Sequence, residues 1–377
     1  MLTSVELFAG AGGLGVGLER AGFRHRAVIE RDQWACDTIR RNTDWPLYQG
    51  DVRDFDWDSI REPIDVVAGG PPCQPFSMGG KHLAFGDSRD MFPALAEAVR
   101  RLRPRAFIVE NVKGLTRPAF AAYFDYIVAR LARPEIVRRE EEDWTEHARR
   151  LCQWPGHSLG YDVSFRVLNA ADYGVPQKRE RVFIVGFRSD LGLDWSFPDP
   201  THSLGALLAD QGRNGDYWQR HCVPHAQRRC VAGGAAERDP GLPWRTVRDA
   251  LAGLPDPEFD PAAARLFHNH AYQPGARFYP GHTGSPLDLP AKTLKAGDHG
   301  VPGGENALVR AGGGGRYFTV RESARLQSFP DDYVIDGSWS EAMRQLGNAV
   351  PVTLARVVGE HVARILSKAQ ARTAEFV

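Results

Sequence analysis

Hydrophobic residues are spaced in two alternating ways over the first third of the chain. Short, largely apolar runs have the length and composition of buried strands, and the segments between them repeat apolar residues every three or four positions, as amphipathic helices do. The expected strands are residues 5–8, 27–30, 64–68 and 106–109, and the clearest expected helices are residues 14–21 and 91–102. Strands that alternate with helices predict βαβ units and a mainly parallel sheet.

This spacing continues for a further stretch and then fades. Residues 163–168 and 181–187 are two more expected strands. From about residue 190 to residue 315 the periodicity is lost, and Gly, Pro, His and aromatic residues dominate. Regular spacing returns at residues 319–326, and residues 352–366 predict a closing helix.

The loss and return of periodicity divide the chain into two domains. We expect an α/β catalytic domain of residues 1–190 plus 320–377, and a smaller, loop-rich domain of residues 191–319 inserted into it. Within the larger domain, the heavily charged residues 134–150 are expected to form a solvated helical face.

Composition and charge exclude several classes of protein. The chain has 377 residues, of which 42% are hydrophobic and 25% charged, as is usual for soluble globular proteins. No apolar run approaches the roughly 18 residues of a membrane span, and the N-terminus has no basic signal region. Five scattered cysteines favour a reduced, cytoplasmic protein. The formal net charge is zero, so a nucleic-acid partner must be inferred from local features.

One cysteine occupies an unusually stiff position. Cys73 stands in the sequence Gly-Pro-Pro-Cys-Gln-Pro-Phe-Ser of residues 70–77, directly after the expected strand 64–68. The flanking prolines fix φ and remove N–H donors, so this loop cannot become a helix. Open α/β sheets carry their chemistry at the carboxyl ends of strands, which makes Cys73 a candidate nucleophile. A buried packing cysteine is the simpler alternative.

A glycine-rich turn indicates a nucleoside site. Residues 10–15 fit the pattern G-x-G-x-x-G between an expected strand and an expected helix, and Glu30 follows twenty residues after Gly10. The glycines permit close backbone approach to a ligand, and the acid can accept hydrogen bonds from ribose hydroxyls. The pattern leaves NAD, FAD and S-adenosylmethionine open, and a tight turn that only packs a helix is the structural alternative.

Six segments occur together in the order found in bacterial-type DNA (cytosine-5) methyltransferases, and the chain resembles that family. They are the methyl-donor loop at residues 6–13, the Pro-Cys loop at 70–77, the Glu-Asn-Val tripeptide at 110–112, the Gln-x-Arg-x-Arg segment at 177–181, the arginine–glutamate segment at 321–330 and the Gly-Asn segment at 345–351. The matching segments span nearly the whole chain.

The resemblance implies a fold and a reaction. It implies a Rossmann-like S-adenosylmethionine-dependent methyltransferase sheet, with residues 191–319 as a target-recognition domain. The expected activity is methyl transfer to C5 of a cytosine flipped out of a specific double-stranded DNA sequence, within a restriction-modification system. A cognate restriction endonuclease is then a functional partner, and a monomer suffices for the chemistry.

The resemblance also assigns catalytic roles. Cys73 is expected to add to cytosine C6 as a thiolate, which activates C5 as a nucleophile. Glu110 is expected to serve as the acid at N3, with its pKa raised by burial. Arg181 is expected to bind the cytosine carbonyl oxygen, and Arg179 to assist near the sugar or phosphate. Asn111 is expected to brace the Cys73 loop.

Binding roles follow in the same way. Phe8 is expected near the adenine, Glu30 at the ribose, and Asp51 at the adenine amino group. The remaining expected donor-binding residues are Gly10, Gly12, Gly13, Pro72, Asn348 and Ala349. The expected DNA contacts are Gln74, Ser77 and Gln177.

Three other interpretations remain open. A Rossmann-fold, NAD-dependent oxidoreductase would use the glycine turn, Glu30 and Cys73, but it leaves residues 177–181 and 345–351 unexplained. A catalytically silent DNA-binding paralogue need keep neither Cys73 nor Glu110. A zinc site could be sought among His221, Cys222, His225 and Cys230. Their spacing fits no common zinc module, so no metal is expected.

Overall fold

The computed structural model describes residues 1–72, 90–154, 159–212, 216–228, 241–278, 283–296, 304–310 and 312–375, with side chains up to residue 369. In this described part of the chain, no helix is long and apolar enough to cross a membrane.

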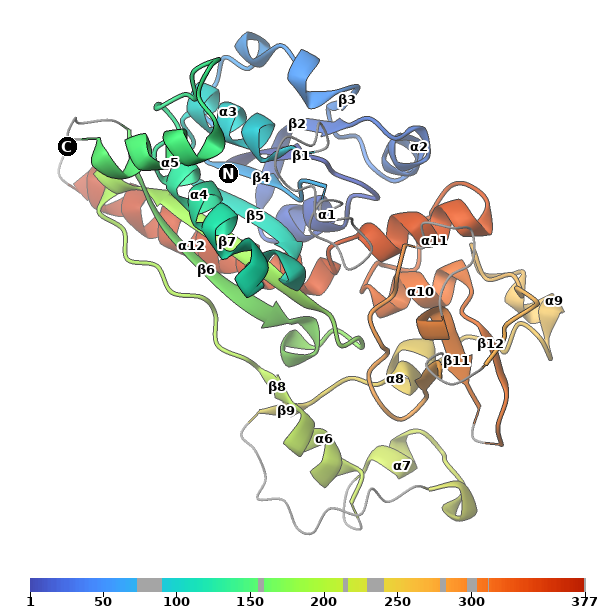
Figure 1. Ribbon diagram of the computed structural model, residues 1–377. Helices are drawn as coiled ribbons and strands as arrows, with labels where there is room; N and C mark the ends of the chain where they lie inside the picture. The colour runs from blue at the N-terminus through green and yellow to red at the C-terminus, as the bar shows by residue number, and fades with distance from the viewer. Residues whose placement is uncertain are drawn as a thin grey trace.

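A seven-stranded sheet in the order β3-β2-β1-β4-β5-β7-β6 forms the centre of the larger part of the molecule (Figure 1). The strands β3, β2, β1, β4 and β5 run parallel, whereas β7 is antiparallel to both β5 and β6. The strand bounds are β1 Leu2–Leu7, β2 Phe23–Glu30, β3 Leu47–Gln49, β4 Val66–Gly69, β5 Ala106–Val112, β6 Tyr161–Asn169 and β7 Glu180–Arg188. The expected mainly parallel α/β sheet is confirmed.

Helices cover both faces of this sheet. One hydrophobic core joins β1, β4 and β5 to α3 and α4, and a second joins the opposite faces of β4 and β5 to α1 and α12. The helix bounds are α1 Gly13–Arg20, α2 Gln33–Asn42, α3 Phe92–Leu102, α4 Ala121–Ala132, α5 Trp144–Gln153 and α12 Val352–Glu375. Burial on both faces explains why these strands are continuous apolar runs rather than alternating ones.

The charged stretch 134–150 differs from its expectation. Helix α5 begins only at Trp144, where Asp143 accepts hydrogen bonds from the amides of Thr145 and Glu146, and Glu146 reaches back to the Asp143 amide. This capping box fixes the start of the helix. The preceding charged residues lie outside any helix, and their ion pairs, such as Arg150 with Glu142 at 2.7 Å, connect them to α5.

The region after β7 is built from short elements. It contains a two-stranded sheet of β8 and β9 and a three-stranded sheet of β10, β11 and β12. The bounds are β8 His202–Ser203, α6 Leu204–Asp210, α7 Tyr217–Arg220, β9 Leu242–Pro243, α8 Val247–Leu251, α9 Pro261–Ala264, β10 Ser285–Pro286, β11 Ala307–Val309 and β12 Gly315–Tyr317. We call residues 191–319 the inserted region.

The chain returns to the sheet through two helices. Helix α10 (Val320–Leu326) begins with a capping box formed by Thr319 and Glu322. Helix α11 (Trp339–Asn348) follows and ends beside the carboxyl edge of β1 and β2, before α12 packs against α1 (Figure 1). The expected closing helix is confirmed and extends past residue 366.

Candidate active site

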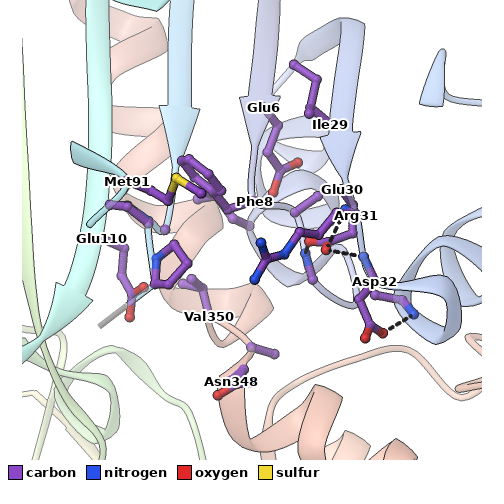
Figure 2. A pocket seen from close by; sticks show the side chains of 18 of the residues that line it. Glu6, Phe8, Ile29, Glu30, Arg31, Asp32, Met91, Glu110, Asn348 and Val350 are labelled. Atoms are coloured by element: carbon purple, nitrogen blue, oxygen red, sulfur yellow. Dashed lines mark hydrogen bonds between the residues drawn. The ribbon is translucent and has the colours of Figure 1, made fainter. Parts of the chain in front are cut away.

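A cavity of about 250 Å³ opens at the carboxyl ends of β1, β2, β4 and β5. Met91 and Glu110 lie on one side of it, Glu30, Arg31 and Asp32 lie on the other, and Phe8 lies between them (Figure 2). Asn348, the last residue of α11, and Val350, just after it, face these strands from residues 345–351, which we call the closing segment. The glycine turn and the closing segment therefore meet at one site, as the resemblance implied.

The glycine turn places its backbone against the closing segment. Phe8, expected in the first strand, lies just beyond β1 with φ of 57°, and Gly10 and Gly12 have φ of 54° and 81°. A Cβ added to Gly13 would lie 2.3 Å from the carbonyl oxygen of Val350. Glycine is therefore required both for the left-handed backbone and for this close approach.

Glu30 connects the second strand to the glycine turn. Its Oε2 accepts a 2.7 Å hydrogen bond from the Gly10 amide, and its Oε1 accepts 2.8 Å bonds from the amides of Arg31 and Asp32. Three amides thus fix the carboxylate at the rim of the cavity. Oε1 already accepts two bonds, so Oε2 is the oxygen that keeps lone-pair capacity for a further donor.

Asp51 also lines the cavity, but it already has a partner. The Arg53 guanidinium donates to both of its carboxylate oxygens, at 2.9 and 2.6 Å. These side-chain hydrogen bonds are the main cause that lowers the pKa of Asp51 to about 2. A ligand amino group at Asp51 would have to share the carboxylate with Arg53.

A buried acid beneath the glycine turn was missed by the sequence analysis. Glu6 is 1% exposed and lines the cavity, and its Oε2 has no hydrogen-bond partner among the described residues. Burial raises the pKa of Glu6 to about 8. The signal in the sequence was an acidic residue within an otherwise apolar strand.

Glu110 and Arg181 form an ion pair at the other side of the cavity. The Nε atom of Arg181 lies 2.9 Å from Oε1 of Glu110, and both side chains are almost buried. The pairing follows from the sheet, because β5 and β7 are antiparallel and Arg181 lies opposite Val112. Burial raises the pKa of Glu110, while the nearby charges of Arg181 and Arg179 act in the opposite direction.

The Pro-Cys loop is seen only at its start. Cys73, Gln74 and Ser77 lie outside the described residues. Pro71 and Pro72 line the cavity, and the Asn111 side chain donates a 3.0 Å hydrogen bond to the carbonyl oxygen of Pro71. This contact confirms that Asn111 braces the residues before Cys73.

Gln177 and Arg179 are held by main-chain groups of distant segments. Both residues are fully buried. Gln177 accepts from the Leu294 amide and donates to the Leu326 carbonyl, while Arg179 donates to the carbonyls of Leu294 and Gly347. These main-chain contacts hold both side chains inside the protein. The DNA contact expected for Gln177 and the sugar or phosphate contact expected for Arg179 stay predictions.

The closing segment is fixed by polar contacts to α2. The Arg344 guanidinium donates to Asp32 at 2.8 Å, and Gln345 accepts a 2.8 Å bond from the Thr38 hydroxyl. Asn348 and Ala349, which the resemblance placed at the donor, line the cavity together with Asp32, Arg344 and Gln345.

No metal centre is formed by the residues that the structure covers. Within them, no group of three His, Cys, Asp or Glu side chains could hold an ion. His221 instead forms a 2.9 Å contact with Asp249, and Cys222 is an exposed free thiol. Cys230 lies outside the described residues.

Comparisons with known proteins agree with this geometry. The Type II methyltransferase M.Eco47II of Escherichia coli is 34% identical over 98% of this chain and 81% of its own length. M.NgoMIV of Neisseria gonorrhoeae is 32% identical, over 97% of this chain and 98% of its own length. The crystal structure of the S. pombe Dnmt2 methyltransferase is similar in fold, with a TM-score of 0.58 at 18% identity over 98% of this chain and 99% of that one.

The family profile covers nearly the whole protein. The sequence model of the C-5 cytosine-specific DNA methylase family matches residues 2–133 and 156–364. These two stretches contain the glycine turn, Glu110, Arg181 and the closing segment, which the fold brings together around one cavity. The chain therefore belongs to the C-5 cytosine-specific DNA methylase family and is a DNA (cytosine-5) methyltransferase.

Proposed function

We propose that the cavity binds S-adenosylmethionine, and that the chain methylates C5 of a flipped-out cytosine through a covalent bond between Cys73 and C6. The observation that carries the proposal is the buried Glu110–Arg181 pair, which shares one cavity with the glycine turn and with the prolines that precede Cys73. An acid, a fixed cation and a nucleoside site are the parts that this reaction needs.

The residues of the cavity suit a nucleoside without phosphates. The rim offers the carboxylates of Glu30 and Asp51 as acceptors for ribose and adenine, and Phe8 supplies an aromatic face. No cationic side chain stands in the glycine turn, so a pyrophosphate has no clamp there. Gly10 lines the cavity and leaves room for the methionine end, with Asn348 and Ala349 opposite and Pro72 along the wall. Gly12 and Gly13 support this site by letting the turn pack against Tyr333 and Val350.

Bound S-adenosylmethionine supplies an electrophilic methyl group, and the chain's residues activate cytosine to receive it. The Cys73 thiolate forms a bond to C6, and the electrons of the C5–C6 double bond become available at C5. A nucleophile that divides a difficult step in this way is characteristic of covalent catalysis. After C5 is methylated, loss of the C5 proton expels the thiolate and restores the double bond.

Glu110 and Arg181 stabilise the charge that develops on the ring. Addition at C6 moves electron density toward N3, where a protonated Glu110 can donate a hydrogen bond. Its raised pKa favours that form. Arg181, held by the same carboxyl group, offers its remaining N–H groups to the cytosine carbonyl oxygen.

The duplex must be opened for this chemistry. Flipping the target base costs about a few kcal/mol of stacking and pairing, which contacts elsewhere on the DNA must offset. We assign residues 191–319 to target recognition on this ground, and Gln74 and Ser77 to contacts with the opened duplex. The names of the Type II relatives further suggest a role beside a cognate restriction endonuclease.

Base-resolution sequencing of 5-methylcytosine tests the proposal. Unmethylated plasmid is incubated with S-adenosylmethionine and either the wild-type protein or Cys73→Ala. We expect methylation at one short motif with the wild-type protein only. Methylation by Cys73→Ala would refute the covalent mechanism. Failure of the folded wild-type protein to bind the donor would overturn the cofactor assignment and favour a nicotinamide-dependent reaction.

A further inference from the structure

Arg179 lies where the cavity wall meets the inserted region. Its Nη2 donates a 2.6 Å hydrogen bond to the carbonyl of Gly347, which lines the cavity at the end of α11. Its Nη1 donates a 3.0 Å bond to the carbonyl of Leu294 in the inserted region. One fully buried guanidinium therefore holds the main chain of both parts.

The main chain at Gly347 is closely packed against residues 294–296. A Cβ added to Gly347 would lie 2.3 Å from the amide nitrogen of Ala296. Gln177 accepts a 3.0 Å bond from the Leu294 amide, so both main-chain polar groups of Leu294 are held by the segment just before β7. A displacement of the cavity wall at Gly347 must then move residues 294–296, because close-packed interiors transmit strain.

Hydrogen bonds from a buried cation are strong, which makes this junction stiff. Bonds from a charged donor are roughly twice as strong as neutral ones, and a buried guanidinium that loses a partner incurs a large desolvation cost. Breaking the hydrogen bond from Arg179 to either the Leu294 or the Gly347 carbonyl therefore costs considerable free energy. The positive charge of Arg179 also acts on Glu110, where it opposes the rise in pKa caused by burial.

We propose that Arg179 is a positioning residue that couples donor binding in the cavity to the order of the inserted region, and hence to DNA binding. The proposal rests on the assignment of the cavity to S-adenosylmethionine. A ligand that fixes Gly347 restricts the Leu294 carbonyl through Arg179, so the motions of residues 285–296 decrease further and this segment is better positioned for the duplex. Coupling of this kind is reciprocal, so bound DNA must tighten the donor by the same factor.

Hydrogen–deuterium exchange tests the coupling without knowledge of the recognition sequence. The full chain is measured with and without S-adenosylhomocysteine, and peptides covering residues 345–350 and 285–296 are compared. We expect slower exchange in both sets in the wild-type protein. In Arg179→Lys, which keeps the charge but loses the two-pronged donor, we expect slower exchange only at residues 345–350.

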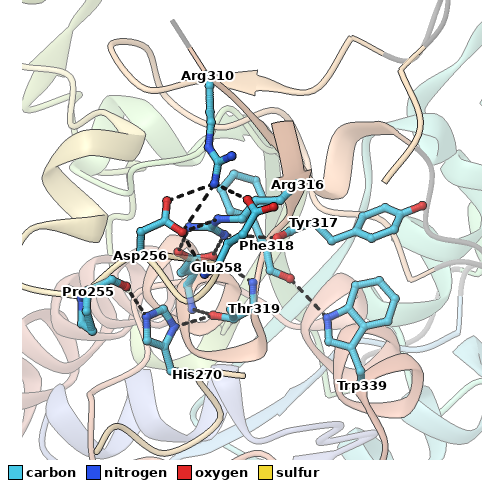
Figure 3. A network of polar contacts seen from close by, with 11 residues as sticks. Pro255, Asp256, Glu258, His270, Arg310, Arg316, Tyr317, Phe318, Thr319 and Trp339 are labelled. Carbon is cyan, nitrogen blue, oxygen red and sulfur yellow. Dashed lines mark hydrogen bonds and ion pairs between the residues drawn. The ribbon is translucent and has the colours of Figure 1, made fainter. Parts of the chain in front are cut away.

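A matched control separates coupling from general loosening. Arg316 is another buried arginine, and its guanidinium donates to both oxygens of Glu322 at 2.7 Å within a network that includes Asp256, Glu258 and Arg310 (Figure 3). It contacts no described residue that lines the cavity. Arg316→Lys should loosen the inserted region but keep the response of residues 285–296 to the ligand.

The outcomes distinguish this inference from the proposed function. Slower exchange at residues 345–350 alone in the wild-type protein would overturn the coupling, even if Arg179→Lys failed to fold. Equal responses in the wild-type and Arg179→Lys proteins would also overturn it. No response at any cavity peptide would instead refute the cofactor assignment, and the coupling would fall with it.

A binding measurement gives the size of the effect once sequencing has identified the methylated motif. The dissociation constant of S-adenosylhomocysteine is measured with and without a duplex carrying that motif. We expect the duplex to tighten the ligand about tenfold in the wild-type and Arg316→Lys proteins. In Arg179→Lys we expect a change below about twofold, and a tenfold effect there would contradict the inference.

Discussion

The sheet domain and the inserted region are stabilised in different ways. The sheet is covered on both faces by extended hydrophobic cores that run through β1, β4, β5 and β7. The inserted region has small separate cores, one of which consists of Leu207, Tyr217, Trp218 and Val223 with Trp244 packed against it. Ion pairs and main-chain hydrogen bonds connect its remaining segments (Figure 3). The chemical site is therefore built on the rigid part, and the inserted region depends on contacts with it.

The largest expected effect is on the methylation rate, and it comes from replacing Glu110 in the sheet domain. Glu110→Gln cannot donate a proton to N3, so we expect the single-turnover methylation rate to fall by about 10²–10⁴-fold. Binding of S-adenosylhomocysteine should change little. Glu97→Gln, on the outer side of α3, is the control and should keep the wild-type rate. A Glu110→Gln rate within a few-fold of wild type would remove the acid role.

A core substitution in each region would sharpen the contrast. Phe107 is fully buried in β5, and Phe107→Ala should lower the free energy of unfolding by about 3–5 kcal/mol in urea titrations. Leu207→Ala, in the small core, should act locally, with faster hydrogen exchange in residues 204–228 and a smaller change in the global transition. Equal shifts of the global transition would show that the two regions unfold as one unit.

A smaller effect, on ligand affinity, is expected from a substitution where the glycine turn meets the closing segment. The methyl group of Gly13→Ala cannot fit 2.3 Å from the Val350 carbonyl, so the turn must move. Displacements of about 1 Å at a binding site can cost up to about 100-fold, and we expect the dissociation constant of S-adenosylhomocysteine to rise by at least about tenfold in calorimetry. Gly312→Ala, with open space around its Cβ, should bind normally.

The smallest effect concerns Glu6 and is seen as a dependence on pH. Its pKa is about 8 in the folded protein and 4.5 is the reference value for the unfolded chain. At a pH between these two values, the folded state therefore holds one proton more than the unfolded state. Stability from this group is present below about pH 4.5 and is lost as pH rises toward 8, by at most about 1.4 kcal/mol per pH unit. The difference in unfolding free energy between wild type and Glu6→Gln should therefore fall from pH 5 to pH 8. A constant difference would mean that Glu6 is ionised throughout.

The sequence was sufficient for the parts of the site that depend on local pattern. The glycine turn and Glu30 could be found because a strand, a turn and a helix follow one another at fixed spacing. Glu110 could be placed because it ends an apolar strand. Each of these inferences needs only neighbouring residues and the rule that parallel strands end at one edge.

The sequence was insufficient where a partner is distant or unexpected. Nothing near Gln177 and Arg179 shows that the main chain at Leu294 and Gly347 will surround them. Asp51 illustrates the opposite case, because its partner Arg53 is only two residues away and a side chain-to-side chain contact was overlooked. The burial of Glu6 depends on how the glycine turn packs over β1, which the neighbouring residues in the sequence do not reveal.

The joint at Leu294 has an implication for how such proteins diversify. Gln177 and Arg179 hold the amide and the carbonyl of that residue, which every amino acid except proline provides. These two hydrogen bonds therefore do not depend on the side chain at position 294, although Leu294 itself packs in a small core. A replacement region of different sequence could be seated on the same enzyme core, provided that its backbone follows the same path, and a new DNA sequence could be read without rebuilding the chemistry.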